Sequence, residues 1–501
     1  MTPSAMAHLD RTVIVRAPSR TVVSTVERER KFSVPPDFRL PSSLGAPQKS
    51  KLIVSTYYDT PSYDLTHAGI TLRYRAERGK RAWQLKLPLC NDRQEVEVAD
   101  SSRTLPIPLL DLLVVHLKHQ QPVPLLTLRV RRASVTVRRQ RRPVAEVSLD
   151  VVSAVKDGHV VLRFRELEIE RLNADTEEIG EIEHLLRRAG ARDHDGRPKL
   201  FRALSLPPPA SNKPPPADAS VADHLKWVLT QHVRWLTSHD PGTRLGAESE
   251  SLHQMRVATR RLRSVLRAAR PILASDWAAS LASELSWLGE CLGQARDLDV
   301  QIAYFREEIS RLEASNRAPL KQFVAHLETK RAHAQQAVLS ELTSARYFDL
   351  IRRLEQAAHD PPLVETADPQ ILQKLAKREF KKLRKAIRRA GAEPDDETLH
   401  TIRIKTKRAR YAAELAVWKA GKPAIRFIKQ ARKVQDVLGS YQDSVTAESY
   451  IHTFFKQSSG ARAGFVAGRL VERQRQRREA LRKDLPTLFK ALLKRGKRAW
   501  A

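Results

Sequence analysis

Two segments of the sequence carry acidic side chains at every second position, a spacing that could hold a metal ion. They contain Glu27 and Glu29, with Lys31 two positions later, and Glu166, Glu168 and Glu170. Successive side chains of a β-strand point to opposite faces, so residues i, i+2 and i+4 share one face. Each segment, folded as a strand, would project its carboxylates into one space, where they could bind a hard divalent cation.

Basic side chains alternate in the same way in two other segments, LRYR and QLK, which contain Arg73, Arg75 and Lys86. For any one strand, the simplest interpretation is a charged face in contact with water. Several such strands, sorted into acidic and basic groups, favour a closed barrel with a charged interior. Because Arg and Lys bind phosphate oxygens, a cavity that contains both kinds of group suits a metal–polyphosphate complex.

The segments that must position these residues indicate two domains. Over residues 23–206, short alternating runs separated by turn residues predict an antiparallel α+β domain, interrupted by helices in IPLLDLLVVHLKHQ and DTEEIGEIEHLLRRAG. Residues 1–22 are interpreted as a polar N-terminal extension, and the proline-rich residues 207–218 as a semi-rigid linker. Over residues 219–501 the apolar positions follow a helical period, which predicts an all-α domain.

The helical half contains an internal repeat, with copies at about 219–365 and 366–501. LHQMR begins a helix at Leu252 and LHTIR begins one at Leu399, and the next helix of each copy ends in a similar way, CLGQARD against VLGSYQD. The matching order and spacing indicate a duplication, with each copy a bundle of about four helices.

Each copy carries a basic stripe headed by a histidine, whose members advance by three, four and three positions. The stripes are His253, Arg256, Arg260 and Arg263, and His400, Arg403, Lys407 and Arg410. This spacing keeps the side chains on one helix face over a rise of roughly 15 Å, long enough to follow several phosphates. The alternative is a solvated basic face, although like charges four residues apart mildly destabilise an exposed helix. Further basic stripes in the second copy are Lys377, Lys381, Arg384 and Arg388, and Lys429 with Lys433.

The composition also indicates a polyanionic partner. The 501-residue chain has a formal net charge of +32, which is typical of proteins that bind nucleic acid, anionic membrane or polyphosphate. Single-strand binders interleave aromatic with basic residues. The stripes contain almost no aromatics, so we expect bare phosphate chains rather than a specific nucleic acid, with phosphate-only contact to a duplex left open.

Two further features bear on the compartment. No apolar run reaches the length needed to span a bilayer. Cys90 and Cys291 lie in different halves of the chain, which indicates free thiols and a cytoplasmic protein.

Taken in order, the motifs resemble two known modules joined in one chain. Residues 23–204 resemble the CYTH domain, also called the triphosphate tunnel metalloenzyme fold. The matching motifs are E-x-E-x-K (27–31), YYDT (57–60), LRYR (72–75), QLKLP (84–88), RVRRAS (129–134), SLD (148–150), ELEIE (166–170) and KLFRAL (199–204). The strand after the basic position often carries a tryptophan in this family, where this chain has Val135. Residues 219–501 resemble the CHAD domain, a duplicated helical bundle named for conserved histidines and associated with inorganic polyphosphate.

The resemblance implies an eight-stranded antiparallel tunnel that binds triphosphate with Mg²⁺ or Mn²⁺. As metal ligands it implies Glu27, Glu29, Asp150, Glu166, Glu168 and Glu170. Around the phosphates it places catalytic Lys31, Arg73, Arg75 and Lys86, and substrate-binding Arg132 and Lys199. A register slip of one residue would exchange Arg132 for Arg131, because it reverses the face of the strand. The two histidine-headed stripes, together with Lys429 and Lys433, would bind inorganic polyphosphate.

The tandem order resembles bacterial proteins taken to be inorganic triphosphatases. We therefore expect hydrolysis of inorganic triphosphate, with polyphosphate binding by the helical domain and an association with polyphosphate granules. Thiamine triphosphatase and adenylate cyclase activities are alternatives in the same fold, and the cyclase would need an adenine pocket for which the sequence shows no signature. An alternative of a different class is a non-catalytic polyphosphate-binding protein, against which the intact set of carboxylates argues.

Overall fold

The computed structural model describes most of the chain. The described residues are 13–17, 20–27, 29–88, 93–100, 102–118, 120–194, 197–206, 213–216, 218–246, 249–364, 370–391, 393–456 and 460–500. For residues 13–17, 20–22, 26 and 27 the structure describes the backbone but not the side chains. Most of the predicted linker lies outside the described residues. The chain forms two compact units, Met1–Asn212 with Asp240–Glu248, and Lys213–His239 with Ser249–Ala501.

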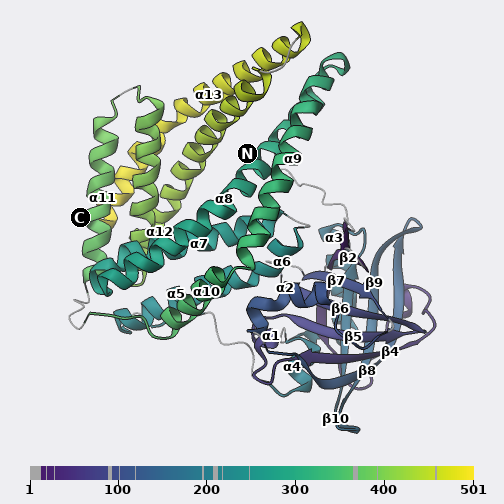
Figure 1. The fold of residues 1–501 in the computed structure, drawn as a ribbon. Coiled ribbons are helices and arrows are strands. Elements are labelled where there is room, and N and C mark those ends of the chain that lie inside the picture. Colours follow the sequence, from purple (N-terminus) through teal and green to yellow (C-terminus); the bar gives the residue numbers. More distant parts are fainter. Residues whose placement is uncertain are drawn as a thin grey trace. The chain divides into compact units, whose positions relative to one another are not determined.

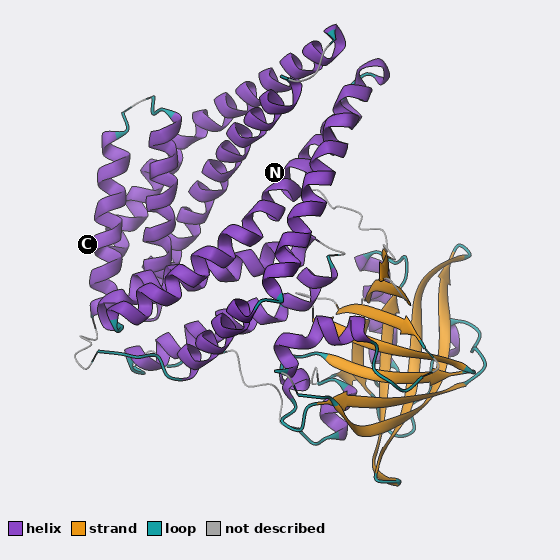
Figure 2. Cartoon of the chain, viewed as in Figure 1, coloured by secondary structure: helices purple, strands orange, loops and turns teal. Residues whose placement is uncertain are grey.

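An antiparallel sheet makes up most of the first unit (Figures 1 and 2). Its strands are β1 (Val13–Ala17), β2 (Arg20–Glu27), β3 (Glu29–Ser33), β4 (Lys51–Asp59), β5 (Thr71–Glu77), β6 (Lys80–Pro88), β7 (Arg93–Ala99), β8 (Val123–Arg139), β9 (Arg142–Lys156), β10 (His159–Arg171) and β11 (Arg192–Asp193). They are ordered β1-β2-β7-β6-β5-β4-β8-β9-β10-β3-β11.

The sheet differs from the expected one in two respects. It contains eleven described strands rather than eight, because the first acidic segment is divided into β2 and β3 and short strands are added at both edges. The predicted polar extension also requires correction, since Val13–Ala17 forms β1 and pairs antiparallel with β2. The sequence of this strand begins with VIV, and β-branched residues of this kind favour strands.

Strands β2 and β3 follow one another in the chain but pair at opposite ends of the strand order. Strand β2 pairs with β7, and β3 pairs with β10. The strands between them, in Figure 2, curve around a common interior rather than lying flat. The E-x-E-x-K segment therefore contributes to both ends of the series that runs from β7 to β10.

Helices cover the apolar faces of the strands and thereby determine which way the charged faces point. Helix α3 (Thr176–Arg188) begins with a capping box, in which Glu178 N–H donates to Asp175 Oδ1 (2.8 Å) and Asp175 N–H donates to Glu178 Oε2 (2.9 Å). Its Ile182 joins a core cluster with Leu167 and Ile169 of β10. Since side chains alternate along a strand, the acidic face of β10 must point the other way, into the interior.

The same logic applies to the basic strands. Helix α2 (Ile107–Leu117) packs its Leu109 and Leu113 in a cluster with Leu72 of β5 and Leu85 of β6. The intervening cations of β5 and β6 therefore face the interior as well. The remaining helices of this unit are short: α1 (Asp64–His67), α4 (Lys199–Ala203) and α6 (Asp240–Leu245), with the 3₁₀ turn η1 (Ser42–Leu44).

The described secondary structure of the second unit is helical apart from one isolated β-bridge, Leu273 with Leu363. Its helices are α5 (Val221–Ser238), α7 (Ser249–Ala269), α8 (Ser275–Arg311), α9 (Arg317–Leu342), α10 (Ala345–His359), α11 (Ile371–Arg389), α12 (Asp396–Phe455) and α13 (Ala461–Trp500), with 3₁₀ turns η2 (Arg270–Ile272) and η3 (Ala314–Asn316). None of the helices in the described part of the chain combines the length and the apolar character that a membrane crossing requires.

Helix α12 consists of two helices joined by a sharp reversal at Gly421, whose φ of 61° and ψ of −148° are not helical. The side chain of His400, near the start of α12, contacts that of Gln442 in its second half, so the two halves lie side by side. In the first copy the corresponding helices, α7 and α8, are separate elements joined through η2.

Candidate functional site

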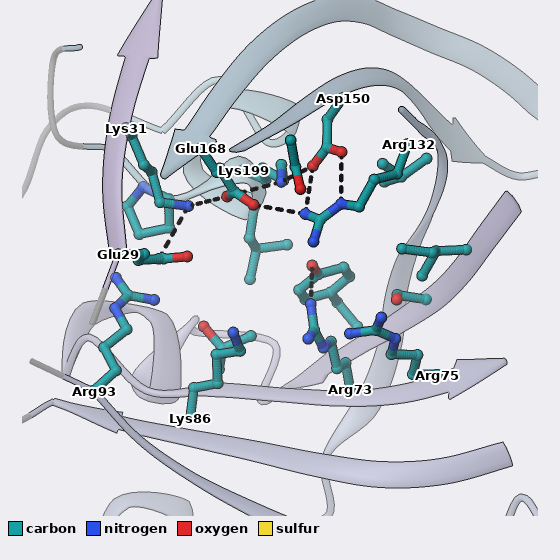
Figure 3. A pocket seen from close by; sticks show the side chains of 18 of the residues that line it. Glu29, Lys31, Arg73, Arg75, Lys86, Arg93, Arg132, Asp150, Glu168 and Lys199 are labelled. Carbon is teal, nitrogen blue, oxygen red and sulfur yellow. Dashed lines mark hydrogen bonds and ion pairs between the residues drawn. The ribbon is translucent and has the colours of Figure 1, made fainter. Parts of the chain in front are cut away.

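Four cations of the first unit point into a hollow inside the sheet. They are Arg73 and Arg75 of β5, Lys86 of β6 and Arg93 of β7, and Figure 3 shows them along one side of the hollow. Arg73 Nε donates to Gln84 Oε1 (2.8 Å), and Lys86 Nζ lies 3.1 Å from Glu95 Oε2. These two contacts follow from the antiparallel register, which places Arg73 opposite Gln84 and Lys86 opposite Glu95.

Carboxylates from β9 and β10 face these cations across the hollow, and two of them, Asp150 and Glu168, already contact cations (Figure 3). Glu168 accepts from Lys31 Nζ (2.7 Å), Lys199 Nζ (3.0 Å) and Arg132 Nη2 (2.6 Å). Asp150, which is fully buried, accepts two bonds from Arg132 (2.8 and 2.7 Å) and one from Lys199 (2.5 Å). Charge-assisted and bidentate bonds of this kind fix both partners.

The ionisation of this cluster follows from its pairing. Burial alone would lower the pKa of Lys31, but Glu168, Glu29 and Glu166 together raise that pKa well above its usual value. Burial alone would raise the pKa of Glu168, but Lys199, Lys31 and Arg132 hold it well below its usual value. Lys31 and Glu168 are therefore both charged at neutral pH, and a phosphate that binds the cations of this cluster would have to replace the carboxylates that hold them.

A row of carboxylates runs across three neighbouring strands beside this cluster. Glu170 of β10 is the direct cross-strand partner of both Glu29 on β3 and Glu146 on β9. Like charges directly opposite one another in a sheet are destabilising. Lys31 Nζ, 3.2 Å from Glu29 Oε1, offsets part of this repulsion. Carboxylate oxygens are the ligands that Mg²⁺ and Mn²⁺ prefer, so a divalent cation at this row would reduce the repulsion further.

The row fits a divalent ion in its donor chemistry, but it is not a preassembled cage. Among the described side chains, no group of three acidic or histidine residues is gathered closely enough to hold a metal ion. The side chain of Glu27, a predicted ligand, lies outside the described residues, although its backbone pairs with Arg93.

The helical unit brings the two basic stripes together. Helices α7 and α12 pack against each other, and cations from both surround Lys407. Burial lowers the pKa of Lys407 to about 7, assisted by Arg403, Arg260 and Arg256 in that order. The pKa of Arg403 is also lowered, by burial and by the same two arginines of α7, although Asp443 opposes the effect. The stripes thus converge on one cationic cluster in which like charges crowd one another.

Comparison with known proteins agrees with both geometries. The CYTH domain model matches residues 26–195, and the CHAD domain model matches residues 228–452. The chain is a CYTH domain followed by a CHAD domain. An uncharacterized protein of Mycobacterium tuberculosis is 28% identical over 513 residues, which cover 95% of this chain and 98% of that protein.

Two solved structures also resemble about half of the chain. PptA from Streptomyces chartreusis is 19% identical and covers 54% of this chain and 100% of its own, and the CHAD domain of the plant Ricinus communis is 26% identical and covers 56% and 95%. Both have a TM-score of 0.46, so neither adds to the assignment.

In the CYTH domain, most of the predicted residues lie where the sequence placed them. Those that line the hollow are Glu29, Lys31, Arg73, Arg75, Lys86, Arg132, Asp150, Glu168, Glu170 and Lys199. Arg132 rather than Arg131 faces the interior, because it pairs with Asp150. Glu166 lies deeper: it is fully buried, 3.2 Å from His194 Nε2 and 3.3 Å from Lys31 Nζ. Its position suits orienting Lys31 better than contacting a ligand in the hollow.

The sequence interpretation missed Arg93 and Glu146 in the CYTH domain. The alternating RQEVEVA segment of β7 carried a signal for Arg93, since it has the same period as the other charged strands. Glu146 carried a similar signal, because it stands four positions before Asp150 on β9 and therefore shares its face.

In the CHAD domain, the members of the stripes have different environments. His400 Nδ1 contacts Gln442 Oε1 (2.9 Å), and Lys429 and Lys433 are exposed on the second half of α12. Arg410 is buried, 3.2 Å from Glu414, and lies over the ring of Tyr411, so it packs inside the bundle rather than on a surface.

Two aspartates of the CHAD domain were overlooked as well. Asp297 accepts from Arg256 (2.7 Å), and Asp443 acts electrostatically on Arg403. Both lie at the matching ends of CLGQARD and VLGSYQD, so the repeat itself carried the signal.

Proposed function

We propose that the CYTH domain hydrolyses inorganic triphosphate with a divalent metal ion inside a closed tunnel, and that the CHAD domain binds inorganic polyphosphate. The observation that supports hydrolysis most directly is that carboxylates and cations face one another across the hollow of the CYTH domain. A receptor for an anion alone would gain nothing from Glu29, Glu168 and Glu170 in its lining. The pairing of consecutive strands β2 and β3 with β7 and β10 supports closure of the tunnel.

The chemistry of phosphoryl transfer fits this set of residues. Hydrolysis of a phosphoanhydride depends mostly on positioning and on neutralising charge at the phosphate oxygens. Arg73, Arg75 and Lys86 would bind and orient the triphosphate from one side of the hollow. Arg132 and Lys199 would also bind the triphosphate, once their bonds to carboxylate oxygens are replaced by bonds to phosphate oxygens. No described side chain stands out as a general base.

The residues that would hold Mg²⁺ or Mn²⁺ are Glu29, Glu170 and Glu146, the partner of Glu170 on the neighbouring strand β9. When bound, the ion would neutralise phosphate charge and lower the pKa of a coordinated water. Glu168 could bind the ion as well only after its bonds to Lys31, Lys199 and Arg132 are broken.

The test is phosphate release by the full-length protein with triphosphate and Mg²⁺ or Mn²⁺. Glu29→Gln and Glu170→Gln should each lower the rate by about 100-fold or more, as loss of one electrostatic contact to the transition state does in other enzymes. Glu181→Gln is the matched control, because Glu181 is exposed and pairs with Arg139 away from the hollow. Unchanged rates in both tunnel variants would refute the proposed metal site.

A substrate panel separates the alternatives within the fold. Tyr57 is the aromatic side chain among the described lining residues, and only 4% of it is exposed, so it offers little surface on which an adenine or thiamine ring could stack. We therefore expect triphosphate to be cleaved faster than ATP or thiamine triphosphate. A preference for either organic substrate would assign a different activity to the same tunnel.

The CHAD proposal rests on the convergence of the two stripes. Arg256→Ala with Arg403→Ala should weaken polyphosphate binding and reduce its salt dependence, because two cations that release counterions on binding are removed. Full affinity in this double variant would refute the proposal. Polyphosphate binding without any hydrolysis of triphosphate would favour the non-catalytic alternative. With or without catalysis, the CHAD domain would associate the protein with polyphosphate granules.

A further inference from the structure

A second cationic surface of the CHAD domain lies between α11 and α12, which pack side by side (Figure 1). From α11 its members are Arg378, Lys382, Lys385 and Arg389. They advance by four, three and four positions, so they share one face of the helix and span roughly 16 Å.

Two adjoining hollows follow this face of α11. The first has a volume of about 490 Å³ and is also lined by Arg408 of α12, Arg267 of α7 and Arg270 of η2. The second has a volume of about 500 Å³ and is also lined by Lys405 of α12. Lys382 lines both hollows, so they adjoin along α11, and we call the two together the α11–α12 groove.

Positive charge in the groove is poorly balanced. Its lining contains two carboxylates, Glu379 and Glu397. Glu379 lies 2.7 Å from Lys382 and 3.8 Å from Arg378. Across the described parts of the chain, no carboxylate lies within ion-pair distance of the other cations of the lining, Arg267, Arg270, Lys385, Arg389, Lys405 and Arg408.

The groove is connected to the histidine-headed stripe of α7. Arg260, Arg263 and Arg267 follow one another along that helix at intervals of three and four residues, so Arg267 extends the stripe by one turn. Burial, and then the nearby Arg263 and Arg408, lower the pKa of Arg267. Arg267 is therefore close both to the end of the stripe and to the α12 side of the groove.

The lining indicates what kind of polyanion would fit. Sequence-tolerant nucleic-acid binders present aromatic rings on which bases stack. The lining of the groove contains one aromatic residue, Tyr411, and only 6% of it is exposed. The groove thus provides cations along its length without a stacking surface, which suits an unbranched phosphate chain.

We propose that a polyphosphate chain bound at the two stripes continues past Arg267 into the α11–α12 groove, so that the CHAD domain holds a longer chain than the stripes alone require. This inference rests on the proposed function, because the stripes must bind polyphosphate first. It assigns the groove to long chains only.

The test compares polyphosphates of about five and about thirty phosphates binding to full-length protein. Lys385→Gln with Arg389→Gln alters two exposed side chains of the groove. Lys321→Gln with Lys330→Gln on α9 removes the same charge from two exposed lysines outside the groove and is the matched control. The groove variant should bind the short chain as wild type does, and should bind the long chain about tenfold more weakly, with a shallower salt dependence.

Three outcomes would overturn the proposal. The first is a loss for the long chain no greater than that of the control variant, and the second is an equal loss for both chain lengths. The third is single-stranded RNA of matched charge that binds as tightly as long polyphosphate and equally needs Lys385 and Arg389, which would make the groove a nucleic-acid site. Failure of the proposed function is recognised separately, because Arg256→Ala with Arg403→Ala would then leave both chain lengths bound.

Discussion

The two charged sites of this protein hold their cations in opposite ways. In the CYTH hollow, Arg132 and Lys199 contact buried carboxylates, and their pKa values are raised because those carboxylates outweigh the effect of burial. In the CHAD cluster, the pKa values of Arg403 and Lys407 are lowered, because burial acts together with neighbouring cations. The hollow balances its cations with buried carboxylates, whereas in the CHAD cluster Asp297 and Asp443 balance the cations only in part.

This difference predicts different kinds of recognition. A ligand of the CYTH hollow must replace internal ion pairs, so it has to match both the released cations and the carboxylates. A ligand of the CHAD cluster only has to bring negative charge, because the free protein already has an electrostatic cost that any polyanion relieves. We therefore expect the hollow to be selective, and the cluster to be tolerant of chain length and sensitive to salt.

The largest expected effect is the loss of a counterion from the hollow. Asp150→Ala would remove one of the two buried carboxylates that hold Arg132 and Lys199 and leave both cations to Glu168, so we expect a loss of about 3 kcal/mol in the free energy of unfolding. Urea denaturation of the full-length protein measures it. Asp150→Asn, which keeps the side-chain volume, separates the effect of charge from that of packing. A loss below about 1 kcal/mol in the alanine variant would contradict the comparison.

Removing a charge from the CHAD cluster should instead raise the free energy of unfolding. In the unfolded chain the pKa of lysine is about 10.4, whereas that of Lys407 in the folded protein is about 7. The folded state thus bears the full cost of a charged Lys407 below pH 7, and loses that cost as the pH rises from 7 towards 10. After allowance for solvent screening, Lys407→Gln should stabilise the protein by about 1 kcal/mol at pH 6.

Thermal unfolding of this variant and of wild type at several pH values measures the effect. The difference in Tm should be about 2–4 °C at pH 6 and should shrink as the pH rises above 7. Lys405→Gln, which removes the same charge from a lysine two positions earlier on α12, is the control. Destabilisation by Lys407→Gln at pH 6 would mean that the cluster is already neutralised.

Polyphosphate binding should take up protons near neutral pH. A bound polyanion favours the charged form of Lys407, so the affinity should fall by a few fold between pH 6 and pH 8. Calorimetry in two buffers of different ionisation enthalpy measures the uptake directly. The effect should vanish in Lys407→Gln, and a pH dependence that persists there would assign it to another group.

The smallest expected effect is a gain in polyphosphate affinity when a counterion of the CHAD cluster is removed. Asp297 accepts from Arg256 at 2.7 Å and is about half exposed, so it competes weakly with phosphate. Asp297→Asn should tighten polyphosphate binding by about twofold, in keeping with the small value of exposed ion pairs. Weaker binding would instead show that Asp297 orients Arg256 for its ligand.

Local spacing predicted the faces of the strands well. The alternation at Arg73 and Arg75, or at Glu168 and Glu170, requires only that the segment be extended, since the period of two then fixes the face. The outcome was correct because the intervening apolar residues pack under α2 and α3.

What the sequence could not supply depends on contacts between distant segments. The depth of Glu166 depends on His194 and Lys31, which lie far apart in the chain, and the strand count depends on where the first acidic segment divides. In α11 the sequence could not fix which face of the helix lines the groove. The sequence KREFKKLRKAIRR has cations at so many positions that the predicted stripe, starting at Lys377, and the observed lining, starting at Arg378, differ by only one residue.

The reversal at Gly421 has a consequence for how the second CHAD copy tolerates change. Its φ and ψ are close to a region that essentially only glycine adopts, and the chain turns there with no intervening loop to absorb an extra residue. An insertion at this point would rotate the following helix by about 100° about its own axis and swing Asp443 away from Arg403. The angle between the two halves of α12 is therefore set by one hinge residue, whereas in the first copy it is set by the η2 connection, which backbone hydrogen bonds tie to Pro362 and Val364.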